Sequence, residues 1–428
     1  MGKIFAVIGN PVLHSMSPQM HSHALREMKI DAIYIRLAAE TKEEALRLAK
    51  EIGISGFSVT TPFKTIIENM DENDESARKA GAVNTVLFKD GKTIGYNTDW
   101  YGVVGPLLAN DVQIRNQKAI VLGAGGAARA AVYGLQKEGA KIVIANRTVE
   151  KAQRLAEEFG SEYCSLDELP QHVHGCRILA GCISTAGRII PKELLREDMA
   201  IVDAYYTKET ALAKDGREAG AAVFDGREWL VYQGMKSFEL FTGIKAPEKI
   251  LRQGVRKREK KANIALIGAM GSGKNTVARS FNGMEVFDVD KEIEKSSGPI
   301  TKIFEEKGEQ AFRDLESKEL EKISGKTNTV ISCGGGAILR DENRKLLNEN
   351  AIVVWLWAAP ETLIKRIPKD GTRPLLNTDD PEKRIRELLA QRKAAYAETC
   401  DMIISTGGKK PEDIAKRISY EIDYAFGS

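Results

Sequence analysis

Cysteine is scarce in this sequence of 428 residues, and long apolar runs are missing. The five cysteines are an odd number, scattered without the paired spacing of a zinc site or a disulfide framework. His172 and His174 alone are too few ligands for a metal site. No apolar run approaches the roughly 18 residues of a membrane-spanning helix, and no cationic leader opens the chain. We therefore expect free thiols, no membrane association and a cytoplasmic location.

An excess of charge of one sign is also lacking, because the formal net charge is only +3. This balance gives no reason to expect nucleic acid or an anionic membrane as a partner, although local basic pockets can still bind small anions. Hydrophobic residues make up 43% and charged residues 29% of the chain, as in an ordinary soluble globular protein. The length suits two or three domains, and the oligomeric state, monomer or homodimer, stays open.

What the chain does have is a regular alternation of apolar, β-rich runs with helical stretches. This alternation predicts an α/β fold with parallel sheets covered by helices. A charge-rich stretch at 245–261 separates two blocks that each carry a glycine-rich turn, and we interpret it as a helix end and linker rather than a nucleic-acid patch. The predicted strands lie in KIFAVIG, AIYIRL, GFSVTTP, KAIVLGAG, KIVIANR, MAIVDAYY, NIALIGAM, TVISCGGG and AIVVWLW.

The first glycine-rich turn lies in KAIVLGAGGAARAAVYGL, where an apolar strand leads through G-x-G-x-x-A into a helix of small residues. Glycines permit the tight turn, and the N–H groups of the helix N-terminus can bind a pyrophosphate. The next strand ends before Asn146, Arg147 and Thr148, with no acidic residue to favour NAD, so a guanidinium can meet a 2′-phosphate. We infer NADP; a dinucleotide fold with a lost or altered site is the alternative. The turn residues expected at the cofactor are Gly123, Gly125, Gly126 and Ala127.

The second glycine-rich turn has the form G-x-x-x-x-G-K from Gly268 to Lys274, again between a strand and a helix. Backbone N–H groups of such a loop wrap the phosphates of ATP, and the lysine neutralises the transferring phosphoryl group. Downstream, Asp288 and Asp290 stand two positions apart. If that segment is extended, their side chains point to opposite faces and have separate roles. The loop residues expected at the nucleotide are Gly271, Ser272, Gly273, Lys274, Asn275 and Thr276.

Upstream of the first turn, GNPVLHSMSPQMH, VTTPFK and GAVNTVLFKDGKTIGYNTDWYG make about the first 240 residues resemble shikimate dehydrogenase. The resemblance implies that Ser15, Ser17 and Thr60 bind the substrate carboxylate. It also implies that Asn84, Asp99 and Gln233 bind ring hydroxyls, and that Lys64 and Asp99 form the catalytic pair. A ketone that accepts hydride from a nicotinamide needs a proton at its oxygen, which a lysine beside a carboxylate can supply.

Two positions depart from that family pattern. Ser58 stands where the family usually has Asn, and Lys208 stands where Pro is common. Both positions neighbour the predicted site, so they put the placement of the substrate in doubt more than the reaction.

The second block, over nearly all of 262–420, resembles shikimate kinase through FDVDKEIE, IFEEKGEQAFRDLE, CGGGAIL, RPLL and QRKAAY in family order. The resemblance implies that Asp288 serves the magnesium shell and that Asp290 accepts the substrate hydroxyls. Arg313 and Arg392 would face the carboxylate of shikimate, and Gly334, Gly335 and Gly336 would complete that site. Arg373, with Arg366 as a weaker candidate, would meet the phosphates; arginine suits such oxygens because its planar fork binds them bidentately.

This half also departs from its family. Asn275 replaces the hydroxyl residue that normally ligates magnesium, although an amide oxygen can ligate the ion or one of its waters. The segment between Lys274 and Asp288 is short, so we expect a clipped first helix and weakened magnesium binding.

Together the resemblances imply a substrate-binding domain at 1–100 and a Rossmann NADP domain at 101–245 whose last helix returns to the substrate domain. A linker at 246–261 and a P-loop kinase domain at 262–428 follow. The implied activity is bifunctional: NADPH reduces 3-dehydroshikimate to shikimate, which ATP and Mg²⁺ then convert to shikimate 3-phosphate, on the route to chorismate and aromatic amino acids. The alternatives are a dehydrogenase joined to a weak or ligand-sensing kinase-like domain, and an enzyme that acts on quinate.

Overall fold

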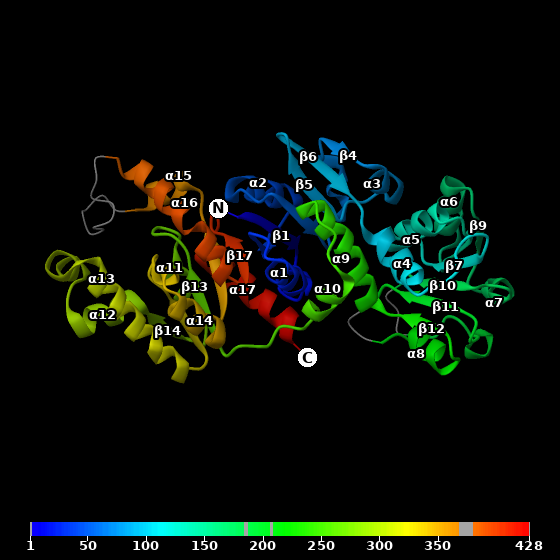
Figure 1. Ribbon diagram of the computed structural model, residues 1–428. Coiled ribbons are helices and arrows are strands. Elements are labelled where there is room, and N and C mark those ends of the chain that lie inside the picture. The colour runs from blue at the N-terminus through cyan, green and yellow to red at the C-terminus, as the bar shows by residue number, and fades with distance from the viewer. Residues whose placement is uncertain (1, 184–186, 206–208, 368–379, 428) are drawn as a thin grey trace. The chain divides into compact units, whose positions relative to one another are not determined.

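The computed structural model describes residues 2–183, 187–205, 209–367 and 380–427 (Figure 1). The chain divides into two compact units. Unit 1 consists of Met1–Pro18, Ile30–Ile54 and Lys257–Ser428, and unit 2 consists of Gln19–Lys29 and Ser55–Arg256. Each predicted apolar run contains a strand, so the α/β class is confirmed.

Unit 1 is built on a sheet in which the strand order is β14-β15-β13-β16-β17-β2-β1. Every pairing along this order is parallel. Strands β13 and β16 are buried along their whole length, which explains why their sequences are continuously apolar rather than alternating. The strands are β1 (Lys3–Gly9), β2 (Ala32–Ala38), β13 (Asn263–Ile267), β14 (Glu285–Asp288), β15 (Thr329–Ser332), β16 (Ala351–Trp357) and β17 (Met402–Ser405).

Strands β1 and β2 belong to the same unit as the C-terminal block, whereas the predicted boundaries place them in a separate domain at 1–100. Strand β17 pairs with β2 through Ile403 opposite Leu37 and Ile404 opposite Ala38, which joins the first strands of the chain to the C-terminal block. The boundaries themselves stay a prediction. The helices of unit 1 are α2 (Lys42–Ile52), α11 (Lys274–Ala278), α12 (Val289–Ser297), α13 (Ile300–Glu321), α14 (Asp341–Asn350), α15 (Pro360–Arg366), α16 (Pro381–Thr399) and α17 (Pro411–Phe426).

Unit 2 holds a small mixed sheet in the order β3-β5-β6-β4 and a parallel sheet in the order β12-β11-β10-β7-β8-β9. The strand order of the parallel sheet reverses between β7 and β10, and ligands of such sheets bind outside the carboxyl ends of the strands at that point. The strands are β3 (Gly56–Val59), β4 (Glu72–Asn73), β5 (Thr85–Lys89), β6 (Lys92–Tyr96), β7 (Lys118–Leu122), β8 (Lys141–Ala145), β9 (Glu162–Cys164), β10 (Ile178–Gly181), β11 (Ala200–Asp203) and β12 (Ala222–Phe224).

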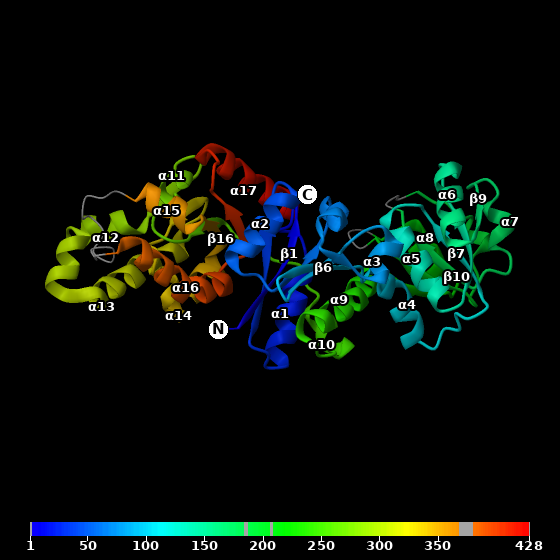
Figure 2. The ribbon, with the colours of Figure 1, turned by 90° about the horizontal axis from the view of Figure 1, so that it is seen from above.

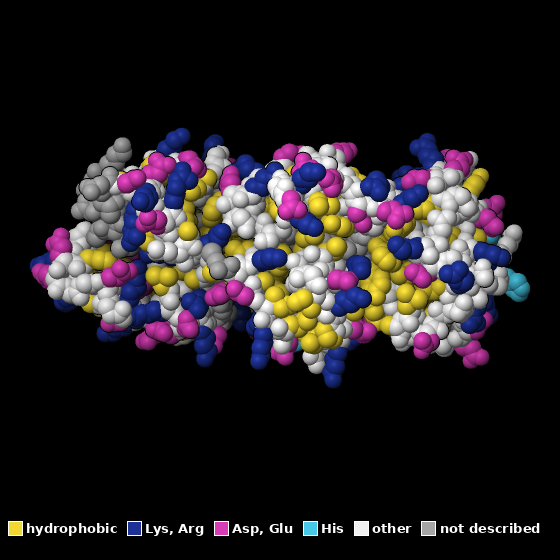
Figure 3. Space-filling model, turned by 45° about the horizontal axis from the view of Figure 1, so that its top comes forward, with side chains coloured by type: hydrophobic (Ala, Val, Ile, Leu, Met, Phe, Trp, Pro, Cys, Tyr) yellow, Lys and Arg dark blue, Asp and Glu magenta, His cyan; other side chains and the backbone are white. Residues whose placement is uncertain are grey.

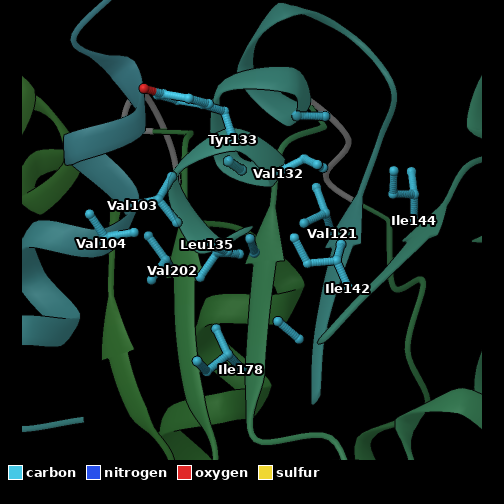
Figure 4. Close-up of a cluster of buried hydrophobic side chains, with 14 of the residues drawn as sticks. Val103, Val104, Val121, Val132, Tyr133, Leu135, Ile142, Ile144, Ile178 and Val202 are labelled. Carbon is cyan, nitrogen blue, oxygen red and sulfur yellow. The ribbon is translucent and has the colours of Figure 1, made fainter. Parts of the chain in front are cut away.

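Helices cover the parallel sheet of unit 2, and the core lies between them and the strands (Figure 4). Val103 from α4, Val121 from β7 and Leu135 from α5 are all fully buried there. The helices of unit 2 are α1 (Ser17–Glu27, of which Ser17 and Pro18 belong to unit 1), α3 (Glu75–Ala80), α4 (Asp99–Ala109), α5 (Gly126–Lys137), α6 (Val149–Phe159), α7 (Leu169–Val173), α8 (Ala211–Glu218), α9 (Gly226–Thr242) and α10 (Glu248–Gly254).

Helix α10 occupies part of the predicted linker, and its Leu251 is fully buried, so this stretch is not simply extended chain. Basic and acidic side chains are interspersed over the face seen in Figure 3, in keeping with the low net charge. Among the described helices, none is both long and apolar enough to cross a membrane.

Candidate functional site

The predicted acid–base pair of unit 2 is in contact. Asp99 begins α4, Lys64 lies in the short 3-10 helix Phe63–Asn69, and Lys64 Nζ is 2.5 Å from Asp99 Oδ2. The Asp99 side chain is only 10% exposed and that of Lys64 is 34% exposed. A buried carboxylate therefore fixes an ammonium group that solvent still reaches, which is an arrangement suited to proton transfer.

Asn84 holds Asp99 from the other side. Its Nδ2 donates to Asp99 Oδ1 over 2.9 Å and to Thr98 Oγ1 over 3.0 Å, while its Oδ1 accepts from the Thr98 N–H at 2.8 Å. Thr98 Oγ1 also lies 3.3 Å from Gln233 Oε1 and 3.0 Å from Ser237 Oγ. The structure thus links three of the predicted residues, Asn84, Asp99 and Gln233, in one network.

Thr98 and Ser237 belong to this network and were missed by the sequence reasoning. Thr98 stands directly before Asp99 in the sequence, and Ser237 lies one helical turn after Gln233 on α9. Their positions next to predicted site residues could have identified both of them. Thr60 follows β3, where its carbonyl accepts from the Phe63 N–H at 3.0 Å.

Ser15 and Ser17 lie in unit 1, after β1, and each is only 7% exposed. The Ser17 N–H donates to Ser15 Oγ over 3.3 Å, and the carbonyl of Ser15 accepts from Arg36 Nη2 at 2.6 Å. The segment that carries the two hydroxyls is therefore fixed by hydrogen bonds of its own unit.

The first glycine-rich turn joins β7 to α5 as predicted. Gly123 has a φ of 117°, and a Cβ there would lie 3.1 Å from the carbonyl oxygen of Cys182, so only glycine fits. A Cβ at Gly125 or Gly126 would meet nothing within 4 Å, and Gly125 caps α5 without a side-chain bond. The open N-terminus of a 12-residue helix, with Ala127 in its first turn, fits the pyrophosphate of a dinucleotide.

Strand β8 is the neighbour of β7 in the parallel sheet, and it is followed by the predicted residues Asn146, Arg147 and Thr148. Asn146 Nδ2 donates to the Thr148 carbonyl over 2.9 Å, and Thr148 is the N-cap residue of α6. Arg147 is exposed and, within the described ranges, forms no ion pair. Its uncompensated charge fits a 2′-phosphate better than a ribose hydroxyl.

The second glycine-rich turn opens onto a cavity of about 710 Å³ in unit 1. Its loop residues Gly271, Gly273, Lys274, Asn275 and Thr276 line the cavity together with Asp288 and Asp290. The Ser272 side chain is fully buried and does not line the cavity, and its contact with the nucleotide through the loop backbone stays a prediction. The predicted substrate residues that line it are Arg313, Gly334, Gly335, Gly336 and Arg392.

The side chains of Lys274 and Asn275 each form hydrogen bonds within the protein. Lys274 Nζ donates to the carbonyls of Gly268 and Ala269 over 2.9 and 3.0 Å. Asn275 Oδ1 accepts from the hydroxyl of Ser332, a residue at the end of β15 that sequence reasoning missed. Helix α11 has only five residues, as the short segment predicted.

Asp288 and Asp290 would point to opposite faces if their segment were extended, but the segment is not extended throughout. Strand β14 ends at Asp288, whose carboxylate accepts from the Lys291 N–H at 3.4 Å and caps α12. Asp290 then lies in the first turn of that helix. The change from strand to helix brings both carboxylates to one cavity, where an acidic pair beside the Asn275 amide oxygen fits a hard divalent cation.

Arg313 is held by two carboxylates on its own helix. Its Nη1 lies 2.8 Å from Glu316 Oε2, and its Nη2 lies 2.9 Å from Glu309 Oε1. Burial lowers the pKa of Arg313, but the charges of Glu316 and Glu309 outweigh it and raise that pKa. The Glu316 side chain is fully buried, and burial raises its pKa more than Arg313 lowers it. Glu316 was missed, although its spacing of three from Arg313 in RDLE places both on one helix face.

The other predicted arginines are Arg392, Arg366 and Arg373. Arg392 Nη1 donates to the carbonyl of Gly335 over 3.2 Å, which ties α16 to the third glycine-rich turn. Arg366 lines the cavity while its Nη2 donates to the Thr406 carbonyl over 2.8 Å. Arg373 lies outside the described residues.

Four family models match the chain. They are the shikimate dehydrogenase substrate binding domain over residues 7–86, shikimate / quinate 5-dehydrogenase over 107–206, the shikimate 5′-dehydrogenase C-terminal domain over 226–256, and shikimate kinase over 270–423. The NADP(+) shikimate dehydrogenase of Pyrococcus abyssi is 38% identical over 257 residues, which cover 59% of this chain and 96% of that protein.

Solved structures agree with this result. Shikimate dehydrogenase from Aquifex aeolicus matches 60% of this chain and 98% of its own at a TM-score of 0.56 and 35% identity. The Thermus thermophilus shikimate 5-dehydrogenase in complex with NADP(H) and shikimate matches 59% of this chain and 98% of its own at a TM-score of 0.55 and 31% identity.

Proposed function

We infer that this chain, which belongs to the shikimate dehydrogenase family and carries a shikimate kinase domain, catalyses two consecutive reactions. The first is the NADPH-dependent reduction of 3-dehydroshikimate to shikimate, and the second is the ATP-dependent phosphorylation of shikimate to shikimate 3-phosphate. The observation that carries the proposal is that one chain holds both a Lys64–Asp99 contact and a phosphate-loop cavity lined by carboxylates and arginines.

In the first reaction, Lys64 is the proton donor. NADPH supplies the hydride when it is bound, and the carbonyl oxygen then needs a proton. The Lys64 ammonium gives that proton from Nζ, and solvent can restore it because the side chain is partly exposed. Asp99 orients the ammonium, and we assign ring hydroxyls to Asn84, Asp99 and Gln233. We assign the substrate carboxylate to Ser15, Ser17 and Thr60.

In the second reaction, Asp290 accepts the proton of the substrate hydroxyl that is phosphorylated. Arg313 and Arg392 bind the substrate carboxylate beside Gly334, Gly335 and Gly336. Lys274 and Arg373 neutralise the phosphates of ATP. Asn275 and Asp288 would hold Mg²⁺, which supplies charge neutralisation at the phosphates when it is bound.

The test uses the full chain in two separate assays. NADP⁺ with shikimate should produce NADPH, and ATP with shikimate and magnesium should release ADP. A third mixture of 3-dehydroshikimate, NADPH, ATP and magnesium should yield shikimate 3-phosphate, and omission of NADPH should abolish it. Absence of NADP⁺-dependent oxidation of shikimate would contradict the first activity, and quinate in place of shikimate tests the neighbouring substrate.

A second candidate is a dehydrogenase whose kinase-like domain is weak or only senses a ligand. The observation that favours it is Asn275, an amide at the position of a magnesium-binding hydroxyl, already bonded to Ser332. NADP⁺-dependent oxidation of shikimate without any release of ADP would support this candidate and overturn the bifunctional proposal. The cytoplasmic location and the monomeric or homodimeric state remain predictions.

A further inference from the structure

Helix α17 contacts the segment that follows β1, residues 10–14, through one face. Arg417, Glu421 and Tyr424 recur at intervals of four and three residues, which places them on the same side of a helix. Arg417 Nη1 donates to Asn10 Oδ1, and the Tyr424 ring meets the His14 ring edge-on at a centroid distance of 5.0 Å. All of these residues belong to unit 1.

Glu421 makes the central contact. Its Oε2 accepts from the backbone N–H groups of Val12 and Leu13 over 2.8 and 2.9 Å. Its Oε1 accepts from Arg417 Nη2 at 2.6 Å. The residue is fully buried. A buried carboxylate with one cation and two N–H donors is well satisfied, whereas its loss would leave two buried N–H groups unpaired.

The segment that Glu421 holds leads directly to Ser15 and Ser17. The Ser15 N–H donates to the Val12 carbonyl over 3.0 Å, so a displacement of Val12 is passed to Ser15. On the other side, Arg36 Nη2 holds the Ser15 carbonyl at 2.6 Å while its Nη1 donates to the carbonyl of Asp401 over 3.3 Å. The segment is therefore fixed between two points of the C-terminal block, α17 and the start of β17.

The other neighbour of α17 is the phosphate-loop helix. Helices α11 and α17 pack against each other, and the buried face of α17 includes Ile414 and Ile418. In Figure 2, α17 runs from the side of α11 towards β1. Helix α17 therefore contacts both the phosphate-loop helix of the kinase part and the segment that follows β1.

We propose that Glu421 is a positioning residue of the dehydrogenase: from the kinase domain, it holds the segment whose Ser15 and Ser17 hydroxyls bind the substrate carboxylate. This inference rests on the proposed function, in which these two serines contact shikimate. Glu421 acts through the backbone of Val12 and Leu13 and touches neither substrate nor cofactor. The dehydrogenase thus depends on the kinase part of its own chain for the geometry of its substrate site.

The test measures the dehydrogenase KM for shikimate and for NADP⁺ in the full chain. Glu421→Ala should raise the KM for shikimate about tenfold, since misplacement by about 1 Å can cost up to about a hundredfold, and should leave the KM for NADP⁺ within about twofold. Glu421→Gln keeps one acceptor oxygen for the two N–H groups but loses the ion pair to Arg417, so its KM should lie in between. The kinase KM for shikimate should not change.

Asp423→Asn is the matched control, because it removes one carboxylate from an exposed position of the same helix. If Glu421→Ala yields no folded protein, Glu421→Gln carries the test, since it preserves the side-chain volume. An unchanged KM for shikimate in the Glu421 variants, together with a raised KM in Ser15→Ala, would overturn the inference alone. An unchanged KM in Ser15→Ala and Ser17→Ala would instead overturn the proposed role of the serines.

Discussion

The proposed catalytic groups of unit 2 and the cations of the cavity in unit 1 differ in what they are bonded to. In unit 2, Lys64 already contacts Asp99, the partner that its chemistry requires. In unit 1, Lys274 is bonded to two loop carbonyls and Arg313 to two carboxylates of its own helix. An anionic ligand that binds these cations replaces bonds that already exist, so its net gain in free energy is smaller than the new contacts alone suggest. In the proposed function, the groups of unit 2 are already arranged for proton transfer, whereas the cations of unit 1 would exchange partners when ligands bind.

The largest effect is expected from Lys64→Met, which removes the proton donor and keeps the apolar stem. The dehydrogenase kcat should fall by about 10²- to 10⁴-fold, the usual contribution of a positioned acid or base. ADP release by the kinase should be unaffected. Lys92→Met is the control, because Lys92 is an exposed lysine of the same unit that forms an ion pair with the exposed Glu72. A fall of less than about tenfold would mean that the contact with Asp99 is structural.

Arg147→Ala tests the cofactor turn and should have the next largest effect. Loss of one charge-assisted hydrogen bond costs about 1.5–3 kcal/mol, so kcat/KM for NADP⁺ should fall by at least about tenfold. The value for NAD⁺ should not change, because NAD⁺ lacks the 2′-phosphate. Arg154→Ala, at an exposed arginine of α6, is the control. An equal loss with both cofactors would show that Arg147 does not read the 2′-phosphate.

The two glycine-rich turns could be predicted from contiguous residues alone, whereas Lys64, Asp99, Asn84 and Gln233, which are distant in sequence, were predicted through the family resemblance. The turns at Gly123 and Gly268 need glycines in a fixed order between a strand and a helix, so they are visible without tertiary structure. Glu421 could not be found in this way, because its partners Val12 and Leu13 are 409 and 408 positions away. The pairing of β2 with β17 depends on the same long-range contacts.

Local helix geometry explains two further differences between the sequence analysis and the structure, at Asp290 and at Glu316. Asp288 and Asp290 read as alternate residues of a strand, but a helix begins between them and changes the direction of the second side chain. Glu316 became visible only once Arg313 was placed on a helix, where a spacing of three residues brings the two side chains together.

The substitution Asn275→Thr tests how residue 275 affects magnesium binding in the kinase domain. If the amide is a weakened magnesium ligand, a hydroxyl at this position should raise ADP release by about threefold at limiting magnesium, which corresponds to about 0.7 kcal/mol, with little change at saturating magnesium. Binding of Mn²⁺ to the nucleotide-loaded protein should tighten in parallel, as measured by electron paramagnetic resonance. Asn282→Thr is the same change at an exposed position. Lower activity in Asn275→Thr would show that the bond between Asn275 and Ser332 matters more than the hydroxyl.

The smallest effect is expected from Glu316→Gln, and it depends on pH. Burial raises the pKa of Glu316 in the folded chain. A carboxyl group of this kind contributes stability that is fully present below its unfolded-state pKa and is lost as the pH rises through its folded-state pKa. The Tm of the unaltered chain minus that of Glu316→Gln should therefore decrease by about 2–4 °C as the pH is raised from acidic to neutral values.

Glu321→Gln, an exposed position of the same helix, should show no such trend. A constant difference in Tm would mean that Arg313 compensates the buried charge completely at every pH. A decreasing difference would mean that Arg313 is paired with a carboxylate whose ionisation is costly. Such a pair would be easier for an anionic ligand to open, because the ligand could take over the Arg313 guanidinium while Glu316 accepts a proton. This exchange of partners would distinguish the cavity of unit 1 from the Lys64–Asp99 contact of unit 2.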